Sequence, residues 1–359
     1  MSSPQPLQGV TEPSFARYRE IIPVLTDSTH KGQGGRVCVL GGSSEYTGAP
    51  YFSGMSALRL GADLCHIICA EDASTAIKSY SPDLIVHPLI RTRTIEQLEL
   101  MTADDDKSRA ATKAVVDKIH AKAKDELNGI LERVHVLVIG PGLSRDATMQ
   151  RVAKYAIQKA RSLFMPVVID ADGLFLIQNE PELIQGYSRA VLTPNLVEFA
   201  RLCKEKKINA EEQAGEQPAA QRLSHAFGGV VVVQKGRHDI ISSGTTVHAV
   251  TNTGGLKRSG GQGDLLTGMI ATSLAWIVVA RRSNQAGAGG EDSQAKNHVH
   301  FLAACYGACT FTRRCSQLAF EKHGRAVQSS DILAEIGPMF AGYVEQARPI
   351  APWSEAIYG

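Results

Sequence analysis

Seven short runs of apolar, mostly β-branched residues recur along the chain, with stretches of helical character between them. They are RVCVLGG (36–42), ADLCHIICA (62–70), DLIVHPLI (83–90), VHVLVIGPG (134–142), PVVIDADG (166–173), RAVLTPN (189–195) and GVVVVQKG (229–236). Most are apolar at consecutive positions, which is typical of strands that helices cover on both faces. The alternation predicts an α/β fold, a three-layer sandwich with a central, mainly parallel sheet flanked by helices.

Many of these runs end in Gly, Pro, Asn or Asp, where the chain turns toward the next helix. In open parallel sheets the ligand lies at the carboxyl ends of the strands. We therefore expect the loops that follow the strands to line one crevice. These loops are GGSSEYTG, GPGLSRD, DADG, TPNLVEF and QKGRHD.

No shift in composition divides the chain, so we expect residues 1–359 to form a single domain. Two segments look inserted. Residues 91–132 are charged and helical in character, whereas residues 281–297, RRSNQAGAGGEDSQAKN, are low in complexity and are expected to form a surface loop.

The net charge of +2 gives no strong field toward nucleic acid. The most apolar helical stretch, residues 265–280, is shorter than the ~20 residues that span a bilayer, so we expect a buried core helix and no membrane segment. The first twenty residues lack the apolar core of a secretory signal. A cytoplasmic location is the prediction, with a mitochondrial one as the alternative.

The seven cysteines are an odd number and lie mostly in apolar segments, which predicts buried free thiols in a reducing compartment. Cys65 and Cys69 are four residues apart, as are Cys305 and Cys309. Neither pair has the spacing or the histidine partner of a zinc site.

The stretch GGLKRSGGQGDLLTG (254–268) carries the strongest chemical signal. A helix that starts near Asp264 would present free N–H groups, and glycines let that backbone approach a phosphate. We expect Gly260, Gly261 and Gly263 to form an anion pocket, with Asp264 placed to take a proton from an attacking hydroxyl. The alternative is that Asp264 only caps the helix.

Polar residues at three other strand ends extend this site. Asn195 and Glu198 could face the crevice, where Glu198 could hold a Mg²⁺–phosphate unit, or they could form a helix capping box. Asp170 and Asp172 could order a loop or hold metal, and ordering is the preferred interpretation. The turn after Lys235 could support the phosphates or base of a nucleotide, or be an ordinary β-turn. Neither a P-loop motif nor a G-x-G-x-x-G motif after a strand is present.

Eight motifs together resemble the eukaryotic ATP-dependent NAD(P)H-hydrate dehydratases, a branch of the ribokinase-like superfamily. They span residues 30–276 in the expected order, and the glycine motif alone is shared with small-molecule kinases of the superfamily. The motifs are HKGQGGRV (30–37), EYTGAPYFSG (45–54), YSPDLIVHP (80–88), GPGLSRD (140–146), PVVIDADGL (166–174), LTPNLVEF (192–199), VVQKGRHDI (232–240) and GGQGDLLTG (260–268).

The resemblance implies a ribokinase-like fold and repair of the S epimer of hydrated NADH or NADPH at the expense of ATP, with Mg²⁺ as the cofactor. It implies that the hydrated dinucleotide contacts Gly142, Asn195, Leu196, Val197, Glu198, Phe199, Ala200, Arg201 and Asp264. It implies that ATP contacts Lys235, Gly236, Arg237, His238, Asp239, Gly254, Gly255, Leu256, Lys257, Arg258, Ser259, Gly260, Gly261, Gln262 and Gly263. Bacterial relatives usually use ADP and carry small residues in place of Leu256, Lys257 and Arg258, so the cationic pair favours ATP.

Two other functions remain open from the sequence. A small-molecule kinase of the same superfamily, acting for example on a hydroxymethyl-pyrimidine, would share Asp264 and the anion pocket. A non-catalytic nucleotide-binding protein is disfavoured by the intact GGQGD motif. A homo-oligomer is compatible with either function.

Overall fold

The computed structural model describes residues 15–92, 105–211, 217–285 and 294–342. Within these residues one nine-stranded sheet has the order β3-β2-β1-β4-β5-β6-β7-β8-β9. The strands are β1 (Arg36–Leu40), β2 (Leu64–Ala70), β3 (Leu84–Ile90), β4 (Val136–Ile139), β5 (Val167–Ile169), β6 (Ala190–Leu192), β7 (Val231–Gln234), β8 (Asp239–Ser242) and β9 (Val247–Val250).

Strands β1 to β7 pair in parallel, and only β8 and β9 run antiparallel at one edge. All seven expected strands are present, each shorter than the apolar run that predicted it, and the short strand after the Lys235 turn is β8. Strand β9 was not predicted, because His248 interrupts its apolar run VHAV and leaves no clear pattern. The mainly parallel sheet is thus confirmed.

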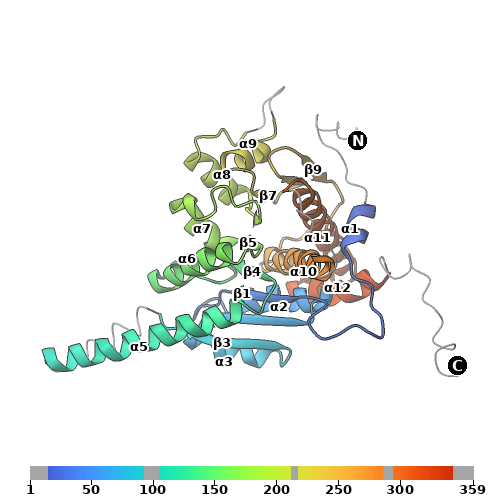
Figure 1. The fold of residues 1–359 in the computed structure, drawn as a ribbon. Helices are drawn as coiled ribbons and strands as arrows, with labels where there is room; N and C mark the ends of the chain where they lie inside the picture. The colour runs from blue at the N-terminus through green and yellow to red at the C-terminus, as the bar shows by residue number, and fades with distance from the viewer. Residues whose placement is uncertain (1–14, 93–104, 212–216, 286–293, 343–359) are drawn as a thin grey trace, which may run out of the picture.

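Helices cover both faces of the sheet (Figure 1). One layer contains α2, α3, α10, α11 and α12, and the other contains α5 to α9, as the packing of neighbouring helices shows. The helices are α1 (Phe15–Ile21), α2 (Gly48–Leu60), α3 (Glu71–Tyr80), α5 (Asp106–Leu131), α6 (Ala147–Ser162), α7 (Ala171–Asn179), α8 (Leu196–Glu205), α9 (Ala219–Ala226), α10 (Gln262–Gln285), α11 (Gln294–His323) and α12 (Ser329–Phe340), with short 3-10 turns at Pro181–Leu183 and Gly324–Ala326.

Helix α10 lies at the centre of its layer, against α2, α11 and strands β1 and β4. The segment Gln262–Arg282 is long and apolar enough to cross a membrane, but 72% of its apolar window is buried inside the protein. This burial supports the predicted core helix. All seven cysteines are free and buried, as expected.

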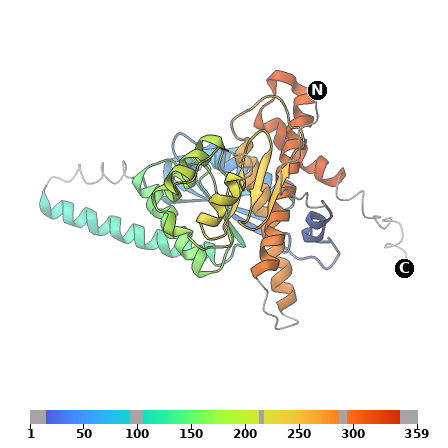
Figure 2. The ribbon, with the colours of Figure 1, turned by 90° about the horizontal axis from the view of Figure 1, so that it is seen from above.

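The two segments that look inserted differ from one another. Helix α5 confirms the helical character of residues 106–131, and its N-terminal half extends away from the body of the molecule in both views (Figures 1 and 2). The loop expected over residues 281–297 is wrong at both ends, because α10 continues to Gln285 and α11 begins at Gln294. Residues 93–104 and 286–293 lie outside the described part of the chain.

The strand order reverses between β1 and β4, so the loops after these two strands diverge to opposite layers. Such a reversal opens a crevice at the carboxyl ends of the strands. Here the loops stay in contact, because the Gly42 N–H donates to the Gly142 carbonyl at 3.0 Å. This edge of the sheet carries the site described next.

Candidate active site

A cavity of about 600 Å³ opens where the chain leaves β6 and β7 and enters α10. Its volume lies in the range of small-molecule sites. Eleven of its lining residues belong to the predicted site, and Leu266, Thr312, Arg313 and Ser316 were not foreseen. The predicted members are Asn195, Leu196, Val197, Lys235, Gly236, Arg237, Asp239, Gly254, Arg258, Gln262 and Gly263.

The N-terminus of α10 is shaped by two glycines. Gly261 has a φ of +97°, and a Cβ there would lie 2.9 Å from the Ser329 hydroxyl oxygen. A Cβ on Gly263 would lie 3.2 Å from Lys235 Nζ, so glycine at this position leaves room for the ammonium beside the start of the helix. Free N–H groups and the positive end of the helix dipole therefore point toward the cavity with a lysine beside them.

Four charged side chains gather beside this helix end. Lys235 Nζ lies 2.7 Å from Asp170 Oδ1, and Asp170 is only 3% exposed. Asp264 and Glu198 lie close enough for their charges to act on this pair. The sheet brings them together from four separate stretches of sequence.

The cluster changes the acidity of its members. Burial, reinforced by the negative charge of Asp170 and opposed by Lys235, raises the pKa of Asp264 to about 8. Burial and then Asp170 also raise the pKa of Glu198. Burial disfavours the charged form of Lys235, but the ion pair with Asp170 outweighs it and raises the lysine pKa. Near neutral pH, Asp264 can therefore both accept and release a proton.

The two capping alternatives have different outcomes. Helix α10 begins at Gln262, so Asp264 lies inside its first turn, and its carboxylate makes no hydrogen bond to any described residue. Asp264 is therefore not a cap. In contrast, Asn195 and Glu198 do form a capping box: the Asn195 amide oxygen accepts from the Glu198 N–H, and one Glu198 oxygen accepts from the Asn195 N–H at 2.8 Å. The second Glu198 oxygen has no hydrogen bond to a described residue.

Asp239 lines the main cavity, and both of its carboxylate oxygens are held by a buried arginine. Arg313, from α11, donates from Nε and Nη2 to the two Asp239 oxygens at 2.7 and 2.8 Å. The same guanidinium donates to the carbonyls of Gly236, Arg237 and Asn252. Asp239 also accepts from the Gly236 N–H. The Asp239 carboxylate thus holds the β7–β8 turn, and because Asp239 also lines the main cavity its contact with ATP stays a prediction. Arg313 lies too far along the chain for any local pattern to reveal it.

A smaller cavity of about 100 Å³ is lined by Glu198 and Arg201, among others. Arg145 borders it, stacked 4.3 Å over the Phe175 ring and 3.4 Å from Asp172. Two arginines thus stand beside two carboxylates, the half-buried Glu198 and Asp172, so the cavity suits a polar ligand. Glu198 and Arg201, which the sequence predicted to contact the hydrated dinucleotide, both belong to α8.

The remaining predicted residues line neither cavity. Phe199 is buried in the core, Leu256 is 83% exposed, and the Lys257 carbonyl accepts from Gln262. Of the cationic pair, only Arg258 reaches the main cavity. Asp264 lines neither cavity but belongs to the charged cluster described above. The other predicted residues that line neither cavity are Gly142, Ala200, His238, Gly255, Ser259, Gly260 and Gly261.

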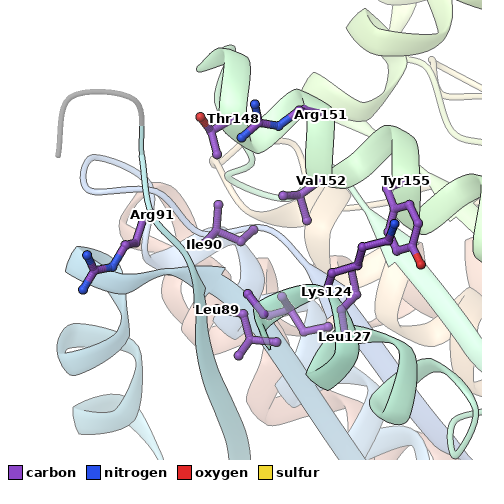
Figure 3. A pocket seen from close by; sticks show the side chains of 11 residues that line it. Leu89, Ile90, Arg91, Lys124, Leu127, Thr148, Arg151, Val152 and Tyr155 are labelled. Carbon is purple, nitrogen blue, oxygen red and sulfur yellow. The ribbon is translucent and has the colours of Figure 1, made fainter. Parts of the chain in front are cut away.

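Another cavity, of about 270 Å³, lies between β3, α5 and α6 (Figure 3). Leu89, Leu127 and Val152 form apolar walls, and Lys124 lies 4.6 Å over the Tyr155 ring. Its lining includes no carboxylate and no cysteine. It therefore lacks the groups for acid–base chemistry that the cluster around Asp264 provides.

No group of three or more His, Cys, Asp or Glu side chains within the described ranges could hold a metal ion by itself. Glu198, with one unbonded oxygen beside an anion pocket, fits a Mg²⁺ ion that takes its other ligands from phosphates and water.

A family model described as NAD(P)H-hydrate dehydratase matches residues 37–338. The chain is 45% identical over 339 residues to a protein of Neurospora crassa named ATP-dependent (S)-NAD(P)H-hydrate dehydratase, which covers 93% of this chain and 94% of that one. A protein of the same name from Schizosaccharomyces pombe is 44% identical over 93% of this chain and 94% of its own. The Homo sapiens protein of that name is 41% identical over 93% and 85%.

Solved structures have the same fold. A ribokinase-like superfamily protein from Enterococcus faecalis superposes with a TM-score of 0.69 at 20% identity, covering 96% of this chain and 100% of that one. An ADP/ATP-dependent NAD(P)H-hydrate dehydratase from Bacillus subtilis, co-crystallized with ATP/Mg²⁺, gives a TM-score of 0.59 at 20% identity over 93% and 100%. These likenesses confirm the ribokinase-like fold.

Proposed function

The chain belongs to the NAD(P)H-hydrate dehydratase family, and we propose that it uses ATP to dehydrate the S epimer of hydrated NADH and NADPH, restoring the reduced dinucleotides. One observation carries this proposal. Asp264 is a carboxylate of raised pKa with no hydrogen bond to a described residue, at the start of a helix whose glycine backbone and lysine neighbour suit a phosphate.

Phosphorylation explains why dehydration requires ATP. The hydroxyl on C6 of the hydrated ring is a poor leaving group, whereas phosphate is a much weaker base than hydroxide. Asp264 removes the hydroxyl proton while the oxygen attacks the γ-phosphorus in line. The ring nitrogen then donates its electron pair as the phosphate departs, and loss of a C5 proton restores the dihydropyridine.

We assign the two substrates to different parts of the site. We place ATP in the cavity of about 600 Å³, where the α10 N–H groups, Lys235 and Arg258 neutralise phosphate charge. We place the hydrated dinucleotide on the side of Gly142, Glu198 and Arg201, with its C6 hydroxyl at Asp264. Mg²⁺ would be held by the ATP phosphates and Glu198, where it would neutralise charge on the transferring group.

We further propose a reducing cellular compartment, the cytoplasm, for this protein. Seven buried free thiols support that location.

The function is tested by mixing the protein with Mg·ATP and acid-hydrated NADH while following the absorbance of the restored dihydropyridine. We expect recovery that requires ATP and stops when the S epimer is used up, because the other epimer points its hydroxyl away from Asp264. A hydroxymethyl-pyrimidine is offered in parallel. No recovery of absorbance, together with a stable phosphorylated pyrimidine, would show that the protein is a kinase.

A further inference from the structure

The proposed reaction removes two protons from the substrate, and Asp264 accounts for one of them. The C6 hydroxyl proton goes to Asp264 during phosphoryl transfer. After phosphate leaves, the ring is an iminium ion between N1 and C6, which water would attack again unless a base takes the C5 proton. C5 is bonded directly to C6, so this base has to lie beside Asp264.

Asp170 lies at this place, directly after β5 and before α7. It stands at the N-cap position of α7 but makes no side-chain capping hydrogen bond. Its Oδ1 is occupied by Lys235 at 2.7 Å. Its Oδ2 makes no hydrogen bond to a described residue, and it lies 3.4 Å from the position of a Cβ built on Gly263, the residue next to Asp264.

Asp170 is 3% exposed, but its Oδ2 is not among the fully buried side-chain atoms that lack a hydrogen-bond partner. This oxygen therefore keeps a small contact with solvent, and it lies beside the backbone of the Asp264 turn. Lys235 fixes the other oxygen and so orients the free one. This arrangement is expected of a base that is oriented toward a substrate atom. A residue that only orders a loop would not need its second oxygen free.

Resting on the proposed function, we propose that Asp170 is the base that removes the C5 proton, with Lys235 as its positioning residue. The C5–H bond breaks, and its proton moves to Oδ2 of Asp170. The electron pair of that bond forms the C5=C6 double bond, and the iminium electrons return to N1. Asp264 meanwhile gives the hydroxyl proton to the departing phosphate, so that every proton and electron pair is accounted for without another reactant.

The test is the ratio of phosphate released to dihydropyridine formed, measured with Mg·ATP and acid-hydrated NADH. We expect a ratio of one for the wild-type protein. In Asp170→Asn the iminium ion forms but is recaptured by water, so dihydropyridine formation falls by about 10²–10⁴-fold while phosphate release falls much less, and phosphate exceeds dihydropyridine by up to the same factor. Asp170→Ala is measured in the same way, so that the result does not depend on how one variant folds.

Asp172→Asn is the matched control, because Asp172 lies in the same turn but pairs with Arg145. Its ratio should stay at one. A ratio of one in the Asp170 variants would overturn the proposal, since loss of a purely structural contact slows both products equally. A raised ratio in Asp172→Asn would overturn it as well. A wild-type protein that forms no dihydropyridine at all would instead contradict the proposed function.

Discussion

Asp264 combines two properties that usually oppose each other. Its pKa of about 8 makes it a competent base near neutral pH, but the same burial makes its ionised form unfavourable in the folded protein. In the unfolded chain the group has a pKa near 3.9. Between these two values the unfolded state releases the proton first, so stability falls as the pH rises from about 4 to about 8.

Asp264→Asn should therefore give a protein that is inactive and more stable. We expect turnover to fall by about 10²–10⁴-fold, because the amide cannot accept the hydroxyl proton. The gain in unfolding free energy over the wild type should be larger at pH 8 than at pH 5, by about 3–4 kcal/mol. Thermal or urea unfolding of both proteins at the two pH values measures this. A variant that is less stable at pH 8 would mean that Asp264 serves the helix and not the reaction.

The β7–β8 turn depends on α11, which is distant in sequence. The Arg313 guanidinium joins Asp239 to three backbone carbonyls and so fixes the turn that begins with Lys235 and Gly236. A lysine could keep one ion pair but has neither the planar fork nor the number of donors. The turn, and with it Lys235, would become less well placed.

Arg313→Lys should raise KM for ATP by about tenfold or more, with a smaller change in KM for the hydrated dinucleotide. Steady-state kinetics with each substrate varied in turn separates the two constants. Arg314→Lys, at the neighbouring position with its side chain hydrogen-bonded to Gln317, is the matched control and should leave both unchanged. Equal increases in both constants for Arg313→Lys would indicate a general loss of structure.

Sequence patterns predicted those features that depend on neighbouring residues, and they did not predict contacts between residues that are far apart in the chain. Apolar runs such as VLVI and VVVQ are local, so they predicted the central strands, whereas His248 interrupts the apolar run in VHAV. The glycine motif predicted the helix start near Asp264, which the structure has at Gln262, because the glycines and the charged residue are adjacent in sequence. The pairing of Asp170 with Lys235 and the hold of Arg313 on Asp239 span 65 and 74 residues. Only the folded sheet brings such partners together, so no local pattern could predict them.

The whole molecule brings a cavity of about 600 Å³ and a cluster of carboxylates together at the carboxyl edge of the sheet. Small-molecule kinases could share such a site, and the fold alone does not distinguish a kinase from a dehydratase. The distinction lies in the fate of the bond between C6 and its oxygen. A kinase leaves that bond intact, whereas the proposed dehydratase breaks it after the oxygen has been joined to phosphorus.

The central claim is that the C6 hydroxyl is phosphorylated before it leaves, and an oxygen label tests this directly. NADH is hydrated in ¹⁸O water, transferred to ordinary water, and treated with the protein and Mg·ATP. Mass spectrometry of the released phosphate should then show one ¹⁸O atom for each dihydropyridine formed, because the hydroxyl oxygen departs as part of the phosphate. Restored dihydropyridine with unlabelled phosphate would mean that the hydroxyl leaves as water, and it would contradict the account.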